Sequence, residues 1–143
     1  MRVGELVRLN REDIDLEARE CIVLGKGAKE RRVYFDAKTK VHLKKYLDSR
    51  RDESKALFVS LDTRAHRMSI GGIELRIRQL GVASGEKAYP HKFRRTLATR
   101  AIDKGMPIEQ VQEMLGHSRI ETTMHYALVN ESNVRLSHRK YLE

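Results

Sequence analysis

The sequence predicts an α+β fold that is mostly helical and contains one small antiparallel β-sheet. Two patterns support this fold class. Near the N-terminus, the apolar runs 21–24 and 32–35 flank a glycine-rich turn at 25–29, which is typical of a β-hairpin. In the second half, apolar residues recur at spacings of three and four between glycines and prolines, which is typical of successive amphipathic helices.

The helices of the first half follow from local patterns. Val3, Leu6 and Val7 lie on one face of a predicted helix that stops near Asn10. After the hairpin, Asp36 can cap a second helix with a periodic apolar face. The apolar positions of that helix are Val41, Leu43 and Leu47.

The rest of the chain predicts one further strand and four helices. The apolar run 57–59 predicts a short buried strand. Ser69 and Ser118 can cap the first and fourth of these helices, and Pro107 suits the start of the third. The polar tail at 130–143 contains enough apolar residues for a short docking helix. The predicted helices span residues 69–80, 91–105, 107–116 and 118–128.

The composition is that of a globular protein and excludes several classes. The chain has 143 residues, of which 40% are hydrophobic and 34% charged, so a sizeable core can form. No stretch approaches the roughly 20 apolar residues that a membrane span needs. Cys21 is the one cysteine, so no internal disulfide can form, which fits a reducing cytoplasm. We therefore expect a cytoplasmic protein with neither a membrane span nor a disulfide scaffold.

The positive charge is clustered rather than spread evenly. The formal net charge is +9, and the segments 26–51 and 64–104 each carry ten basic and three acidic side chains. Clustered positive charge suggests a polyanionic partner, because neutralised phosphates release counterions. DNA, RNA and an acidic membrane surface all remain open on charge alone, as does an ordinary solvated basic surface.

Three groups of residues suit chemistry at an anionic phosphate. Lys26 lies between two glycines at the hairpin tip, where little blocks its approach to a ligand. His91 and Arg94 lie three residues apart, so an imidazole that moves protons and a guanidinium that grips oxygens share one helical face. His117 and Tyr126 can reach one cleft because a helix break separates them, although a phenol needs a base or cations to become a nucleophile. Each signal alone has a common structural explanation, such as an exposed turn lysine or a half-buried tyrosine.

Arg2 and Glu5 form a further pair, in which a carboxylate can orient a guanidinium or make a weak surface ion pair. Taken in order, these features resemble the catalytic domain of tyrosine recombinases, the phage-integrase family. The resemblance covers nearly the whole chain and implies the tyrosine recombinase catalytic fold over residues 1–143. The matching segments are R-V-G-E-L-V-R-L with E-D-I-D, G-K-G-A-K-E-R, H-K-F-R-R-T-L-A-T and L-G-H-S-R-I-E-T-T-M-H-Y.

The resemblance implies site-specific DNA recombination by strand cleavage and rejoining, as in an integrase. Tyr126 would attack a backbone phosphate, form a 3′-phosphotyrosyl bond and release a 5′-hydroxyl. Lys26 would be the general acid for the leaving oxygen, and His91 would act in proton transfer. The resemblance implies no cofactor and no metal, because another 5′-hydroxyl later attacks the phosphotyrosyl bond.

The remaining roles and the partners are also implied by the resemblance. Arg2 and Arg94 would hold the non-bridging oxygens, His117 would hydrogen-bond the phosphate, and Glu5 would occupy the supporting acidic position. The implied partner is double-stranded DNA, bound by a homo-tetramer of the full-length, nucleoid-associated protein, with no membrane partner. Family members carry an N-terminal DNA-binding domain ahead of this region. We therefore expect an N-terminally truncated catalytic domain whose activity alone is weak or lost.

Three alternative functions remain open from the sequence. A catalytically impaired remnant of a recombinase would bind DNA without cleaving it. Type IB topoisomerases share the tyrosine chemistry. A zinc hydrolase could use His91, His117 and His125, although the chain has neither H-E-x-x-H nor C-x-x-C.

Overall fold

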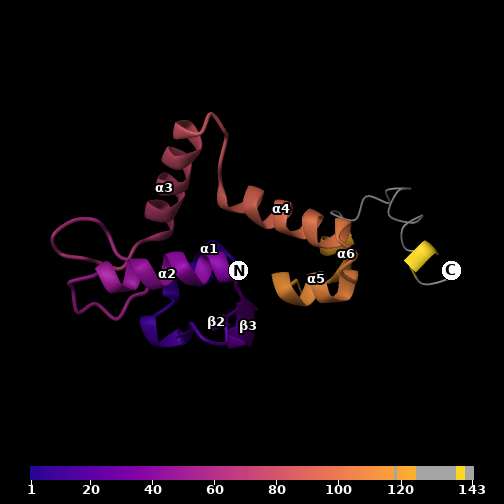
Figure 1. Cartoon of the computed structure of the whole chain (residues 1–143), viewed down its shortest axis with the longest axis horizontal. Helices are drawn as coiled ribbons and strands as arrows, with labels where there is room; N and C mark the ends of the chain where they lie inside the picture. The colour runs from indigo at the N-terminus through magenta and orange to yellow at the C-terminus, as the bar shows by residue number, and fades with distance from the viewer. Residues whose placement is uncertain (118, 125–137, 141–143) are drawn as a thin grey trace. The chain divides into compact units, whose positions relative to one another are not determined.

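The computed structural model describes residues 1–117, 119–124 and 138–140 of the chain (Figure 1). The chain forms two compact units, Met1–Tyr89 and Pro90–Glu143, and each has its own hydrophobic core. Most of the predicted tail helix at 130–143 lies outside the described residues, as does Tyr126. The mostly helical α+β class predicted from the sequence is confirmed.

The first unit contains the antiparallel sheet, in the order β1-β2-β3. Its strands are β1 (Ile14–Asp15), β2 (Glu20–Leu24) and β3 (Glu30–Tyr34). In the β2–β3 register, Cys21 pairs with Val33 and Val23 pairs with Arg31. Cys21, Val23 and Val33 are buried because alternate residues of a strand face the same side. The predicted hairpin is thus confirmed.

Three helices complete the first unit, namely α1 (Val3–Arg8), α2 (Ala37–Ser49) and α3 (Ile70–Ala83). Two of the predicted caps are present, because Asp36 Oδ1 accepts from the Thr39 amide at 2.7 Å and Ser69 Oγ accepts from the Gly72 amide at 3.1 Å. Leu43 and Leu47 of α2 pack against the core as predicted. The prediction for Val41 is wrong, because this side chain lies on the solvent side of α2 and is 65% exposed.

The run 57–59 is buried, as predicted, but it is not a strand. The described chain makes only single bridges here, between Asn10 and Ala56 and between Val59 and Arg67. The backbone here is instead paired with several partners: a side chain binds the adjacent carbonyls, the Leu57 amide donates to the Leu9 carbonyl at 2.9 Å, and the Phe58 carbonyl accepts from the Met68 amide at 3.0 Å. The apolar pattern alone could not distinguish these two ways of pairing a buried backbone.

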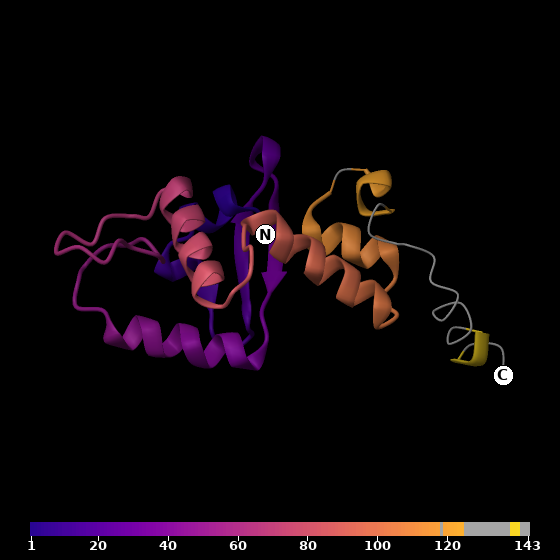
Figure 2. The same cartoon turned by 90° about the horizontal axis from the view of Figure 1, so that it is seen from above.

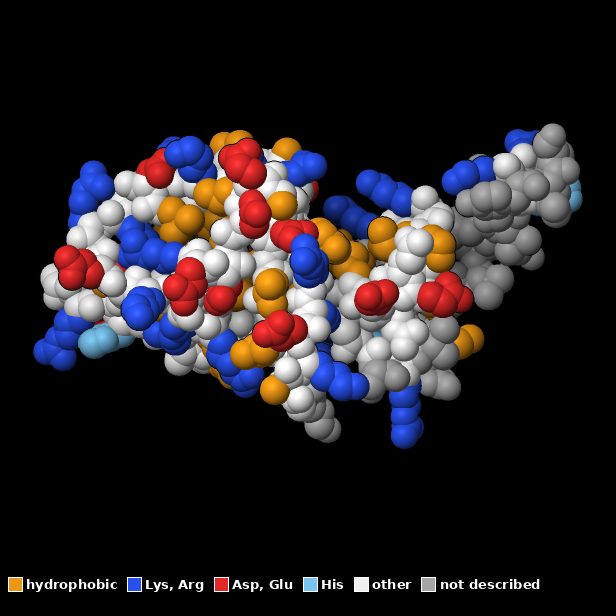
Figure 3. Space-filling view, turned by 90° about the horizontal axis from the view of Figure 1, so that it is seen from below, with side chains coloured by type: hydrophobic (Ala, Val, Ile, Leu, Met, Phe, Trp, Pro, Cys, Tyr) orange, Lys and Arg blue, Asp and Glu red, His pale blue; other side chains and the backbone are white. Residues whose placement is uncertain are grey.

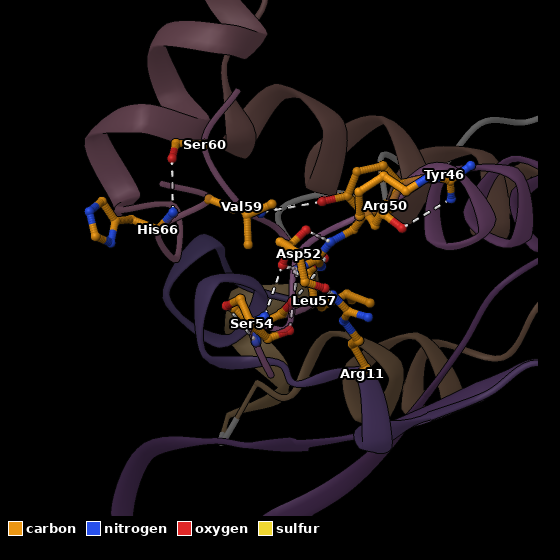
Figure 4. A network of polar contacts seen from close by, with 12 residues as sticks. Arg11, Tyr46, Arg50, Asp52, Ser54, Leu57, Val59, Ser60 and His66 are labelled. Atoms are coloured by element: carbon orange, nitrogen blue, oxygen red, sulfur yellow. Dashed lines mark hydrogen bonds and ion pairs between the residues drawn. The ribbon is translucent and has the colours of Figure 1, made fainter. Parts of the chain in front are cut away.

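Arg50 is the side chain that satisfies this backbone (Figure 4). Its guanidinium is 4% exposed and donates to the carbonyl oxygens of Ala56 at 2.6 Å and Leu57 at 2.8 Å. It also donates from Nε to Asp52 Oδ2 at 2.8 Å and lies over the Tyr46 ring. The hydrogen bond from Arg50 holds the pKa of Asp52 well below its usual range. This network fixes the loop between α2 and α3.

The second unit consists of α4 (Pro90–Asp103), α5 (Ile108–Leu115) and α6 (Ile120–Met124). Its core is formed by Ala98, Val111 and Leu115, each with no exposed surface. The predicted stop at Gly116 is confirmed, because this residue adopts the left-handed conformation (φ 66°, ψ 41°) that ends many helices. The turn at Gly116 sends the chain back from α5 toward α6.

No helix among the described residues is both long and apolar enough to cross a membrane.

Replacing Arg50 by alanine is expected to lower the free energy of unfolding by about 3 kcal/mol, because buried carbonyls and Asp52 lose their donor. The matched control is Arg51→Ala, whose exposed side chain bonds the Asp48 carbonyl at 3.1 Å and should cost less than about 0.5 kcal/mol. Urea unfolding followed by circular dichroism measures both. Equal losses for the two variants would contradict this role of Arg50.

Candidate active site

The first unit joins Arg2 and Glu5 through a third residue, Arg31. Arg2 precedes α1, and its amide donates to Glu5 Oε2 at 2.6 Å while its Nη1 lies 3.3 Å from Glu5 Oε1. Arg31 reaches the same carboxylate from β3 with two bonds, at 2.8 and 2.9 Å. Glu5 therefore connects the helix that follows Arg2 to the hairpin that carries Lys26.

Glu5 is buried but remains a carboxylate. Burial by itself would raise the pKa of Glu5. Hydrogen bonds from Arg31 and from the Arg2 amide, together with the positive charges of both guanidinium groups, outweigh burial and lower this pKa. The site therefore keeps one fixed negative charge between two arginines at neutral pH.

The Lys26 turn begins beside this cluster. The amide of Gly25 donates to the Lys29 carbonyl at 2.8 Å and closes the turn, and Gly27 has a φ of 73° that favours glycine. A Cβ added at Gly25 would lie 3.7 Å from Glu5 Oε1. Figure 2 shows this turn at the far end of the hairpin from α2. Only the backbone of Lys26 belongs to the described structure.

The second unit brings Arg94 and His117 together. Arg94 lies on α4 and His117 follows the Gly116 turn at the end of α5. Arg94 Nη2 donates to the Leu115 carbonyl at 2.9 Å and lies 3.3 Å from His117 Nε2. Two groups that can bind one anion are thus neighbours, although 23 positions separate them in the sequence.

His117 is held on several sides. Its amide donates to the Gln112 carbonyl at 3.1 Å, and the Gln112 side-chain amide donates to the His117 carbonyl at 3.1 Å. Its ring Nδ1 lies 2.9 Å from the hydroxyl of Thr123, on α6. The ring therefore has a defined orientation within the second unit.

The other two predicted residues of this half of the chain, His91 and Tyr126, have fewer contacts that can be described. His91 is exposed in the first turn of α4, three residues before Arg94 and so on a neighbouring part of the helix surface. Tyr126 lies beyond the end of α6 and outside the described residues. Within the described ranges, no three His, Cys, Asp or Glu residues form a metal-binding group, and His125 of the zinc alternative lies outside those ranges.

Sequence reasoning did not identify Arg31 or Thr123. Arg31 lies two residues before the buried Val33, so strand alternation could have placed it on the inner face of β3. Thr123 lies in the five-residue helix α6, and no local pattern indicates that its side chain has no exposed surface.

Arg31→Met is expected to cost about 3 kcal/mol of unfolding free energy at pH 7, because it removes one partner of a buried ion pair. Arg32→Met is the control from the same strand, because Arg32 is 63% exposed and its pair with Glu20 should contribute at most about 1 kcal/mol.

Acid should reduce the cost of Arg31→Met. A lowered pKa for Glu5 means that its pairing stabilises the fold above the ordinary value of 4.5 and is lost as pH falls through the folded-state value. Thermal unfolding of both variants between pH 7 and pH 3 measures this. A cost that stays constant over that range would exclude the ion pair as its source.

Known proteins resemble this chain in both sequence and fold. The model of the Phage integrase family matches residues 1–133. Tyrosine recombinase XerA of Thermococcus kodakarensis is 34% identical over 142 residues, covering 98% of this chain and 50% of that protein. Tyrosine recombinase XerC of Corynebacterium glutamicum is 39% identical over 140 residues, covering 95% and 44%. The chain therefore spans about half the length of these curated relatives.

Solved structures agree with the sequence matches. The crystal structure of XerA recombinase has a TM-score of 0.82 at 34% identity and covers 98% of this chain and 53% of that one. The Tn1549 transposon integrase shares the fold, with a TM-score of 0.79 at 19% identity over 100% of this chain and 55% of that one. The predicted tyrosine recombinase fold is thus confirmed. With a family match that extends from Met1 across both units to residue 133, the chain belongs to the phage integrase family.

Proposed function

We propose that this chain is the catalytic part of a site-specific DNA recombinase that cleaves and rejoins strands through a 3′-phosphotyrosyl intermediate. The observation that carries the proposal is the Arg94–His117 pair, held at 3.3 Å in a family whose similar members are named tyrosine recombinases. A guanidinium and an imidazole side by side suit a phosphate whose oxygens gain charge during the reaction.

The proposed cleavage step balances without any added reactant. The Tyr126 oxygen bonds to the phosphorus, the bond from phosphorus to the 5′-oxygen breaks, and the phenolic proton is taken up by a nearby base. Lys26 supplies a proton to the leaving 5′-oxygen, and His91 acts in proton transfer. Rejoining is the reverse attack by a 5′-hydroxyl, so the phosphodiester energy is kept and no cofactor or metal is required.

The arginines and their supports stabilise the transition state in this proposal. Arg2 and Arg94 hold the non-bridging oxygens, and His117 hydrogen-bonds the same phosphate. Glu5 supports Arg2, since it accepts bonds from both the backbone and the side chain of that residue. Losing one such contact typically lowers the rate about 10²–10³-fold.

Double-stranded DNA is the proposed partner. The Tn1549 integrase, which shares the fold, was solved in complex with transposon right end DNA. The net charge of +9 favours a polyanion. In Figure 3, however, acidic side chains are interspersed among the basic ones of the first unit, so charge alone does not mark the DNA-binding face.

The assembly and location follow from the proposed reaction. Exchanging both strands of two duplexes requires four cleavages and therefore four tyrosines, which favours a homo-tetramer of the whole protein on DNA. A protein that recombines DNA is expected to associate with the nucleoid in the cytoplasm. We propose that residues 1–143 supply the catalytic domain of this assembly.

Tyr126→Phe is expected to abolish covalent attachment to DNA while leaving DNA binding unchanged, because only the nucleophilic oxygen is removed. The substrate is a library of nicked duplexes with randomised sequence around the nick, whose short cleaved strand diffuses away and traps the phosphotyrosyl bond. Adducts that resist denaturing detergent are counted by gel electrophoresis. Tyr89→Phe, which alters an exposed tyrosine of the first unit, is the control and should keep the adduct.

The same experiment separates the two functions that the sequence left open. Binding without any adduct for the unmodified chain would show that residues 1–143 alone bind DNA without cleaving it, as a catalytically impaired remnant does. An adduct that persists in Tyr126→Phe would refute the proposed nucleophile.

A further inference from the structure

Thr123 is a buried polar side chain whose hydroxyl contacts His117. Glu5 and Thr123 are both buried polar residues. The buried carboxylate of Glu5 is paired with Arg2 and Arg31. Thr123 has no exposed surface, and its hydroxyl lies 2.9 Å from His117 Nδ1. A buried hydroxyl needs a hydrogen-bond partner, and here that partner is a residue of the candidate site.

The neighbours of the His117 ring determine where its proton lies. An arginine guanidinium donates hydrogen bonds and never accepts them. The contact of Arg94 Nη2 with His117 Nε2 at 3.3 Å therefore requires Nε2 to accept, which means that Nε2 carries no proton. The proton of the neutral ring then lies on Nδ1, and the Thr123 hydroxyl oxygen accepts it.

Gln112 acts on the main chain of His117 and not on its ring. Gln112 bonds the His117 backbone at both its amide and its carbonyl, so it positions the main chain and leaves the side chain to rotate. Thr123 acts on the ring itself, from a separate helix. A hydroxyl oxygen also accepts the Nδ1 proton whether or not Nε2 is protonated, so the ring need not turn when Nε2 changes its partner.

We propose that Thr123 is a positioning residue that holds His117 with its proton on Nδ1 and with Nε2 directed toward Arg94. Its effect on catalysis rests on the proposed function, in which Arg94 and His117 bind the phosphate. The proton position itself does not depend on that function, so the two ideas can fail separately.

The first test reads the proton position directly in the 143-residue chain. Long-range ¹H–¹⁵N correlation spectra distinguish the two ring nitrogens of each histidine by the ¹⁵N shift of the protonated and unprotonated atom. The chain has six histidines, and His117→Asn identifies the signals of His117 by removing them. We expect a neutral ring protonated at Nδ1 near pH 7.5. A ring protonated at Nε2 would overturn the proposal.

The second test compares three threonine variants. Thr123→Val keeps the shape of the side chain but removes the hydroxyl that accepts the Nδ1 proton, so the fraction of the neutral ring protonated at Nδ1 should fall even though Arg94 remains. Thr123→Ser restores the hydroxyl and should restore that fraction. Thr122→Val, at the exposed neighbouring position, should change nothing. Circular dichroism checks that each variant is folded, and a Thr123→Val spectrum identical to that of the unmodified chain would overturn the proposal.

Adduct formation on the nicked duplex library gives the catalytic consequence. Thr123→Val should slow it by about 10- to 10²-fold, because a misplaced contact group weakens transition-state binding. Thr123→Ser should return it to within about threefold of the unmodified chain. If the unmodified chain forms no adduct, residues 1–143 do not cleave DNA on their own, and the spectra alone decide the role of Thr123. If adducts form and Thr123→Val forms them as fast as Thr123→Ser and the unmodified chain, Thr123 has no positioning role in the reaction.

Discussion

A carboxylate that is buried away from water must be paired with a cation or with hydrogen-bond donors. In the first unit, the buried carboxylate is that of Glu5, and the residues of the candidate site lie around it. The side chain is 4% exposed and binds both Arg31 and Arg2. Its partners come from β3 and from the residue before α1, so a single carboxylate joins the hairpin to the N-terminal helix. Satisfying one buried charge therefore also orients a guanidinium that the proposed reaction needs at the phosphate.

In the second unit, neutral groups rather than charged ones hold the candidate site residue His117 in place. Its core is small, and the Gly116 turn places His117 between α4 and α6 without a regular element of its own. Hydrogen bonds then supply the order that packing does not, from Gln112 to the backbone and from Thr123 to the ring. Each unit thus presents cationic or proton-carrying groups that are held by buried partners, which is what electrostatic catalysis of phosphoryl transfer requires.

Buried backbone carbonyls in the loop between α2 and α3 must also be paired. Arg50 binds the carbonyls of Ala56 and Leu57, and neighbouring backbone groups bond Leu9 and Met68, so this apolar run has no single partner strand. A periodic pattern indicates which residues are buried, but it does not indicate what pairs their backbone. The exposed Val41 shows the converse, since a residue can match the apolar pattern of a helix and still lie on its outer side.

Sequence alone determined the elements whose signals are local. The hairpin follows from two apolar runs around a glycine turn, the caps of α2 and α3 from Asp36 and Ser69, and the end of α5 from Gly116. It also named Arg2, Glu5, Lys26, His91, Arg94, His117 and Tyr126 through their order along the chain. Tertiary structure decided which of these touch: Arg94 with His117, and Glu5 with Arg2. It also revealed Arg31 and Thr123, because a contact between residues 26 positions apart, or one on a different helix, depends on how the elements pack and leaves no periodic trace in the sequence.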